Sequence, residues 1–481
     1  MRLAGRAISY SVILGALVML VAGCSGRGIS SPTLSTQSVT VKPAALLRTP
    51  LSLDAFPSSI DAFPSSIGAF PSSLSAFPTC NVPATHGQAM CHSQYRSDIA
   101  VNGNPATPVT SIQGYHPADL QDAYGLTAAA ATAGSDQNVA IVVAYHNPNL
   151  SSDLNVYRAT FGLPTCLSAN APPAPGGGLL GGLLGGPPAP SAGPPAPGGG
   201  PGAAPAAGPG AIKNCLNVVW QAGGNKWSGK GKGPSYDPNW GTEEVLDAEM
   251  VSAVCPNCSI TVYESRDAQI SNLASAAEAA ADNGATEVSN SYTLPETPDL
   301  AQYAQDYVAP GVPMTASAGD QGYGPGFPAT LPTVTAVGGA SLVHAAMGWG
   351  EAVWPGTGSG CSGFAAKPSW QTDTGCKNRT VNDLAVDADP ATGVAAYVSA
   401  VGGWAVFGGT SIGAPMVAGM YALAENGSNI NDASSLYANA NSFAPVAARA
   451  NGTCYPNYLC TGGPGYDGPS GLGMPYGLSA F

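Results

Sequence analysis

Apolar runs and helical stretches alternate along most of the chain. Residues 139–144 form a continuous apolar run, which is typical of a strand buried on both faces. Further strands are predicted at residues 259–263, 287–291, 313–317, 334–338 and 395–398, and helices at residues 243–254, 268–283 and 411–424. This alternation predicts an α/β fold with a mostly parallel central sheet and crossover helices.

The N-terminus has the pattern of a bacterial export signal. Arg2 and Arg6 precede a mostly apolar run over residues 8–22, which is too short to span a bilayer comfortably. The run ends in VAGC, which resembles a lipobox with Cys24 as the lipidated residue. We expect a lipoprotein signal peptide at residues 1–23 and a location on the outer surface of a bacterial membrane, or secretion. An ordinary signal peptide with an incidental cysteine is the alternative.

Two low-complexity segments interrupt the pattern. Residues 24–107 indicate a stalk, because a seven-residue repeat from Asp54 carries one Phe-Pro per copy and builds no continuous apolar face. Residues 171–210 are rich in Pro, Gly and Ala, and we expect them to form a disordered surface insertion. A folded domain is predicted at residues 108–481, with ordered sequence from about Tyr115.

Charge and cysteine content narrow the classes of partner and compartment. Charged residues make up 9% of the 481 residues and the net charge is -13, which argues against nucleic acid and anionic headgroups as partners. Without Cys24, ten of the 11 cysteines remain, which fits an oxidising compartment. The simplest pairing joins near neighbours: Cys80/Cys91, Cys166/Cys215, Cys255/Cys258, Cys361/Cys376 and Cys454/Cys460. A redox or zinc motif is the alternative for Cys255/Cys258, but no second CxxC or His pair completes a zinc site.

A serine stands where a glycine-rich segment turns into an apolar helix. Ser411 lies in the sequence GGTSIGAP, directly before that helix. There its hydroxyl would be exposed beside oriented amides, which suits nucleophilic attack and stabilisation of an oxyanion. A helix cap is the alternative use of a serine at this position.

A nucleophilic serine needs a base, and carboxylates are the candidates in this chain. None of the five histidines stands in a favourable context, and His86 and His92 precede the predicted folded region. Glu243 and Asp247 are four residues apart on one face of a predicted helix. Such a pair would share a proton and accept the serine proton at acidic pH, where a histidine is already protonated. A solvated acidic helix start is the alternative.

Asp320 supplies a further carboxyl in a glycine-rich turn after a predicted strand. A protonated Asp320 can donate a hydrogen bond to an oxyanion, which an ionised one cannot do. The alternative is a turn aspartate that bonds to its own backbone.

Taken together, these segments resemble the sedolisin family, the serine-carboxyl peptidases. Further matching blocks lie at residues 327–329, 337–339, 358–364, 368–371 and 387–393. The resemblance implies a subtilisin-like three-layer fold, with Ser411 as nucleophile, Glu243 as base, Asp247 as its orienting partner and Asp320 as oxyanion donor. Ser289, Asn290 and Ser291 resemble the strand that pairs with an extended polypeptide substrate.

The chain departs from the family pattern in two places. Family precursors carry a large folded prodomain where this chain has its predicted stalk. The family also has a C-terminal calcium site, whose matching positions here are Val446, Gly463, Gly465 and Asp467. Pro445 replaces an expected Asp ligand, and the loss of one anionic ligand weakens a hard-cation site. Calcium is therefore an open expectation.

The expected function is that of a secreted, monomeric serine-type endopeptidase. It would hydrolyse polypeptides at acidic pH through an acyl-enzyme on Ser411. The alternative is a catalytically silent surface protein that binds peptides or matrix on the same fold.

Overall fold

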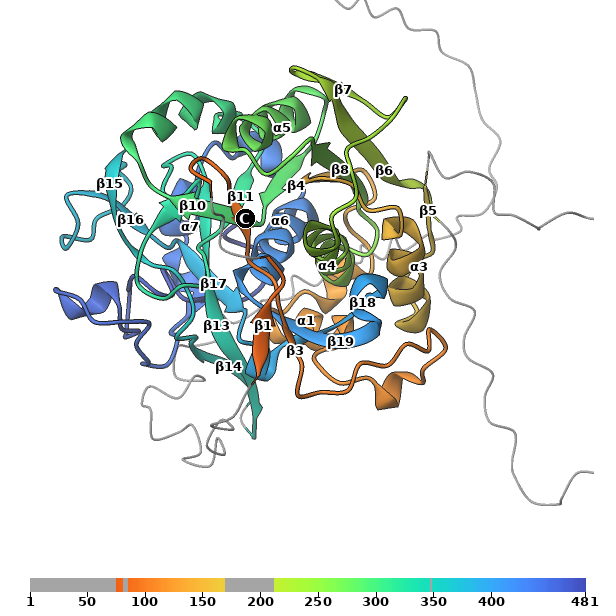
Figure 1. The fold of residues 1–481 in the computed structure, drawn as a ribbon. Coiled ribbons are helices and arrows are strands. Elements are labelled where there is room, and N and C mark those ends of the chain that lie inside the picture. Colours follow the sequence, from red (N-terminus) through yellow and green to blue (C-terminus); the bar gives the residue numbers. More distant parts are fainter. Residues whose placement is uncertain (1–74, 81–84, 169–211, 347) are drawn as a thin grey trace, which may run out of the picture. The chain divides into compact units, whose positions relative to one another are not determined.

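A central sheet of ten strands carries the fold (Figure 1). The computed structural model describes residues 75–80, 85–168, 212–346 and 348–481, all within the unit that spans residues 56–481. The main path of the sheet runs β14-β13-β11-β9-β4-β8-β6-β5, while β17 pairs with β13 and β7 with β6. The strands of this sheet are β4 (Asn138–Ala144), β5 (Cys166–Ser168), β6 (Ile212–Gly223), β7 (Lys226–Ser228), β8 (Ser259–Ser265), β9 (Glu287–Asn290), β11 (Met314–Ser317), β13 (Thr335–Ala345), β14 (Gly348–Val353) and β17 (Leu384–Asp387).

The pairing in this sheet is parallel except for the antiparallel pairs β13–β14 and β6–β7. Helix α5 lies on one side of it, and α4 and α6 lie on the other (Figure 1). Strand β4 is apolar from Val139 to Ala144, because a parallel sheet covered by helices offers no solvated face. The predicted α/β fold with a mostly parallel sheet is confirmed.

Seven α-helices are present in the described part of the chain. Helix α4 is buried on all sides from Trp240 to Val254, which explains why its polar residues include carboxylates with no solvent contact. The helices are α1 (Pro117–Ala123), α2 (Thr127–Ala130), α3 (Leu150–Thr160), α4 (Pro238–Val254), α5 (Ile270–Asp282), α6 (Gly413–Ala424) and α7 (Ser434–Ala438). Short 3₁₀ helices cover Val109–Ser111, Pro298–Tyr307, Pro390–Thr392, Ser399–Val401, Thr410–Ile412, Gly427–Asn429, Ala440–Ser442 and Asn457–Leu459.

Smaller sheets surround this layered core. One has the order β1-β3-β19-β18 and another the order β12-β10-β2, while β15 pairs with β16 and β20 with β21. Their strands are β1 (Ala76–Pro78), β2 (Met90–Cys91), β3 (Gln94–Arg96), β10 (Tyr292–Pro295), β12 (Gly326–Phe327), β15 (Gly360–Ala366), β16 (Asn378–Val381), β18 (Val394–Val398), β19 (Gly403–Gly408), β20 (Phe443–Ala444) and β21 (Met474–Pro475).

The expectation that ordered sequence begins near Tyr115 is wrong. Strands β1, β2 and β3 lie within the predicted stalk, and Cys91, His92 and Ser93 are almost fully buried. The physical reason is that β2 pairs with β10 and β3 pairs with β19 of the domain, while β1 pairs with β3. This pairing satisfies backbone groups that a free stalk would leave to water. The signal peptide, Cys24, the Phe-Pro repeats before residue 75 and the insertion at 171–210 lie outside the described residues.

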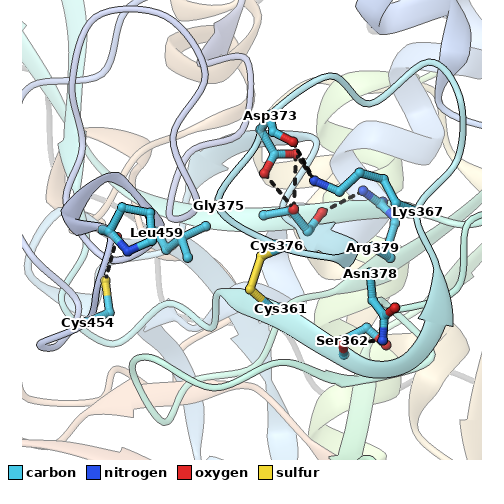
Figure 2. Close-up of a disulfide and its surroundings, with 12 residues drawn as sticks. Cys361, Ser362, Lys367, Asp373, Gly375, Cys376, Asn378, Arg379, Cys454 and Leu459 are labelled. Carbon is cyan, nitrogen blue, oxygen red and sulfur yellow. Dashed lines mark hydrogen bonds and ion pairs between the residues drawn. A yellow bond between two sulfur atoms is a disulfide. The ribbon is translucent and has the colours of Figure 1, made fainter.

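All five predicted disulfides are present. Figure 2 shows the bridge between Cys361 on β15 and Cys376, with the ion pair of Lys367 and Asp373 nearby. Such bridges stabilise a domain mainly by restricting its unfolded chain. Among the described residues, no helix has the length and apolarity needed to cross a bilayer.

Candidate active site

Ser411 lies in the 3₁₀ turn Thr410–Ile412, directly between strand β19 and helix α6. The prediction that α6 begins at Ser411 is therefore two residues early, because a tight turn precedes the first α-helical residue, Gly413. Gly409 connects β19 to this turn and has a φ of +98°. A Cβ at Gly409 would lie 2.8 Å from Asp320 Oδ2. A glycine is needed at this position because an L side chain has neither the backbone conformation nor the space.

Helix α4 delivers the carboxylate pair to the same place. Asp237 caps the helix by accepting hydrogen bonds from the backbone N–H groups of Asn239 and Trp240, at 2.9 and 3.0 Å. Glu243 and Asp247 follow in the helix, four residues apart, so they lie on one face, and both are fully buried. The Ser291 hydroxyl donates to Asp247 Oδ1 at 2.7 Å and to the Ser411 carbonyl at 3.3 Å. Ser291 thus joins the carboxylate pair to the turn that holds the serine.

Burial controls the protonation of this pair. It raises the pKa of Glu243, an effect opposed by hydrogen bonding from the Ser411 and Ser93 side chains. It also raises the pKa of Asp247 well above its usual range, and the charge of Glu243 adds to the effect. Glu243 Oε1 and Asp247 Oδ2 each lack a hydrogen-bond partner among the described residues. A proton shared by the two carboxyls fits both facts, since two neighbouring buried charges are costly.

Asp320 completes the group from the turn that follows β11. Its Oδ1 accepts hydrogen bonds from the Thr410 backbone N–H and hydroxyl, both at 2.8 Å. Part of the residue reaches solvent, yet burial of the carboxyl raises its pKa to about 7 against these hydrogen bonds. Below that pH the carboxyl carries a proton and can donate a hydrogen bond. The structure therefore brings Ser411, Glu243, Asp247 and Asp320 together from three separate segments.

The three residues predicted to pair with substrate are all buried. Ser289 and Asn290 belong to β9, which is enclosed between β4 and β11 of the central sheet. Ser291 is also buried and accepts a hydrogen bond from the Ser411 hydroxyl to its carbonyl, at 3.4 Å. Strand β10 instead pairs with β2, where Tyr292 and Thr293 stand opposite Cys91 and Met90. Enclosure by neighbouring strands leaves Ser289 and Asn290 no free edge.

The prediction that His92 precedes the folded region is wrong, because it lies against the serine. Its backbone N–H donates to Ser411 Oγ at 3.0 Å, while its ring Nε2 lies 2.6 Å from Thr293 Oγ1. Burial lowers the pKa of the imidazole to about 3, so the ring is neutral. The ring contacts Thr293, and no hydrogen bond joins it to Ser411. One signal in the sequence could have revealed this segment: a close cysteine pair, Cys80/Cys91, has little use inside a stalk.

The residues matched to a calcium site fit a cation poorly. Asp467 Oδ1 accepts from the Ser470 N–H and hydroxyl, and Oδ2 accepts from the Gly463 N–H at 2.9 Å. Three protein donors thus occupy about three of the four lone-pair directions of the carboxylate. Pro445 contributes no carboxylate, and Val446 is buried. No cluster of three His, Cys, Asp or Glu residues suited to a metal occurs in the described part of the chain.

Comparison with known proteins relates the chain to bacterial peptidases. No model of a protein family matches it. It is similar to kumamolisin from Bacillus sp. (strain MN-32), with 32% identity over 286 residues that cover 51% of each chain. It is also similar to sedolisin from Pseudomonas sp. (strain 101), with 29% identity over 34% of this chain and 33% of that one. The chain thus spans about half, or less, of the length of these curated relatives.

A solved structure shares the fold. The serine-carboxyl proteinase sedolisin of Pseudomonas, complexed with two molecules of pseudo-iodotyrostatin, aligns with a TM-score of 0.55 and 20% identity. The alignment covers 76% of this chain and 96% of that chain. The likeness extends to the layered α/β architecture that surrounds the candidate site.

Proposed function

From the premise that the chain belongs to the sedolisin family, we propose that it is a serine-type endopeptidase that hydrolyses polypeptides at acidic pH. One observation carries the proposal. The buried Ser411 side chain hydrogen-bonds to Glu243 of the buried Glu243/Asp247 pair, whereas the nearby His92 ring contacts Thr293.

The proposed reaction follows from the contacts of these groups. Ser411 Oγ attacks the substrate carbonyl, and the singly ionised Glu243/Asp247 pair takes the hydroxyl proton. The Ser411 N–H and the protonated Asp320 stabilise the oxyanion. Glu243 then returns the proton to the leaving amine, and water hydrolyses the acyl-enzyme. At acidic pH this pair has a role that a histidine, already protonated, could not fill.

The proposal is tested by hydrolysis of casein at about pH 4, below the usual pKa of histidine and above that of most exposed aspartates. Ser411→Ala and Glu243→Ala should each lower kcat/KM by at least about 10³-fold, because they remove the nucleophile or its base. Full activity in Ser411→Ala would refute the mechanism, and an inactive wild-type chain would favour a silent binding protein.

Glu249→Gln is a matched control for these substitutions. Glu249 is a buried carboxyl on the same helix, and its Oε2 accepts a hydrogen bond from the Tyr397 N–H at 3.0 Å. The amide oxygen of Gln can accept the same bond. Wild-type activity is therefore expected, and it would show that loss in Glu243→Ala is not a general effect of altering buried α4 carboxyls.

We further propose export with a lipid anchor at Cys24. The VAGC sequence and the five disulfides of the domain support the proposal. Metabolic labelling with palmitate should mark the wild-type chain and not Cys24→Ala. Calcium binding stays a prediction, for which the hydrogen-bonded state of Asp467 implies weak affinity at most; calorimetric titration with Ca²⁺ would test it.

A further inference from the structure

Exposed lysines of this acidic chain gather on one hairpin. The net charge is -13, and the 481 residues include only 16 lysines and arginines. Lys226, Lys230 and Lys232 fall within seven residues of one another, and residues 212–236 contain no Asp or Glu. All three lysines are exposed, and none takes part in an ion pair among the described residues. The hairpin therefore presents positive charge that no carboxylate of its own segment offsets.

A strand pair tied to the core carries these lysines. Strand β7 pairs antiparallel with β6, with Gln221 opposite Trp227, and β7 lies at the outer edge of the fold in Figure 1. The Trp227 ring packs on Tyr263 of β8, with the ring centroids 5.7 Å apart. Gln221 Nε2 donates to Asn272 Oδ1 of α5 at 2.9 Å. The lysines thus extend from a fixed base and not from a free tail.

The loop after β7 folds back over the same hairpin. A Cβ at Gly233 would lie 3.5 Å from Trp220 Cδ2 on β6. Two residues further on, the Ser235 carbonyl accepts a hydrogen bond from the His146 N–H at 3.1 Å. The two lysines of this loop, which lie between β7 and Gly233, are therefore kept beside the hairpin.

Arg266 adds a fourth exposed cation next to β6. Its backbone N–H donates to Gln221 Oε1 at 3.0 Å. The neighbouring acid is Asp267, whose Oδ1 accepts a hydrogen bond from the Asn272 amide at 2.7 Å. One carboxylate against four cations leaves a net positive surface. We call its cations the basic patch: Lys226, Lys230, Lys232 and Arg266.

The acidic pH of the proposed activity determines which anions would stay charged near this surface. At about pH 4, roughly half of exposed Asp and Glu side chains are protonated, which weakens an acidic polypeptide as a partner. A phosphate group in a phosphodiester or a polyphosphate keeps its negative charge at that pH. Anionic lipid headgroups and soluble polyphosphates share this chemistry.

We propose that the basic patch is a docking surface for a bilayer that carries anionic phospholipid headgroups. A bilayer presents many phosphates in one plane, so several lysines on one hairpin can contact it at once. Tyr236, which is 45% exposed, ends the same loop and offers an aromatic ring of the kind that lies at headgroup depth. The proposed anchor at Cys24 would hold the domain near such a surface, and the patch would determine which face turns toward it.

The net charge of the whole chain does not oppose this docking. At about 0.1 M salt, charges act over a Debye length of about 10 Å, which is shorter than the width of a domain. The patch therefore governs the approach of its own face, whatever the carboxylates elsewhere contribute.

Vesicle sedimentation tests the proposal on the full-length chain with Cys24→Ala, which has no acyl group to insert. At about pH 5 and about 0.1 M salt, it should bind vesicles that contain phosphatidylglycerol at least about tenfold more tightly than vesicles of phosphatidylcholine alone. At about 1 M salt the difference should vanish, because screening then acts over about 3 Å. Equal binding to the two kinds of vesicle, or a preference that survives the salt, would overturn the proposal.

Single substitutions provide the matched control. Lys230→Gln should weaken binding to phosphatidylglycerol vesicles about fivefold, whereas Lys230→Arg keeps the charge and should keep the affinity. Lys377→Gln makes the same change of charge at an exposed lysine directly before β16, at the opposite edge of the fold from β7 in Figure 1. This variant should bind as the parent chain does. Equal losses in Lys230→Gln and Lys377→Gln would mean that only net charge matters, which contradicts a defined patch.

Other outcomes separate this inference from the proposed function. A chain that binds soluble polyphosphate but neither kind of vesicle overturns membrane docking. Lys230→Gln should hydrolyse casein as the wild type does, because the patch lies outside the catalytic group. No preference for phosphatidylglycerol together with intact casein hydrolysis overturns this inference alone. A clear preference in a chain that never hydrolyses casein supports docking and argues against the peptidase.

Discussion

At the scale of single residues, Asp320 shows how burial sets the chemistry of the site. Its carboxyl is held by Thr410 and has a pKa raised to about 7. In the proposed mechanism it must be protonated to donate to the oxyanion. As the pH rises through about 7 the proton is lost, and the oxygen changes from a donor into a repelling anion. Activity should therefore fall on the alkaline side of that value.

Asp320→Asn tests this role, because its amide donates at every pH and its oxygen can still accept from Thr410. The loss of kcat/KM near pH 7 should disappear from the profile of Asp320→Asn. Asp320→Ala, which has no donor, should lose about 10²- to 10³-fold in kcat. An unchanged alkaline limb in Asp320→Asn would mean that another group sets it.

At the scale of elements, helix α4 begins earlier than its pattern predicted. The expected start was Glu243, whereas the helix runs from Pro238 with Asp237 as its cap. An Asp followed by Pro is a recognisable start signal, so the sequence contained this information. The shared face expected for Glu243 and Asp247 gave no sign that the whole helix is buried, because its burial depends on packing against α6 and the sheet.

The cap of α4 can be tested without touching the catalytic group. Asp237→Ala removes the acceptor for two backbone N–H groups and should lower the free energy of unfolding by about 1 kcal/mol. Asp237→Asn keeps an acceptor oxygen and should lose much less. Denaturant midpoints measure both, and equal losses in the two variants would argue that the cap contributes nothing.

At the scale of the whole molecule, buried carboxyls outside the site make the folded state more stable at acidic pH than at neutral pH. Burial raises the pKa of Glu287 and of Glu351 to about 8, and that of Asp467 to about 7. An acid with a raised folded pKa contributes stability that is fully present below its unfolded pKa, near 4, and is lost as the pH rises through the folded value. His92 acts in the opposite sense, since its lowered pKa favours neutral pH.

The melting temperature should therefore rise as the pH falls from about 8 to about 5, since several carboxyls outweigh the one imidazole. Glu351→Gln is the control: its oxygen can still accept from the Tyr124 hydroxyl, as Glu351 does at 2.8 Å, but it has no ionisable proton to lose. The variant should show a shallower pH dependence than the wild type. Calorimetry at several pH values measures it, and a melting temperature that falls on acidification would contradict the argument.

The sequence alone determined the class of fold, the cysteine pairs and the residues with the chemistry for the site. Local pattern was enough for these, since strand and helix periods, close cysteines and the spacing of Glu243 and Asp247 are properties of neighbouring residues. The tertiary structure decided which distant segments contact these residues. Only folding could bring the edge of β10 and the carboxyl of Glu243 against residues 87–96. The contacting segments are 150 or more residues apart, and contacts at that separation leave no periodic pattern in the sequence.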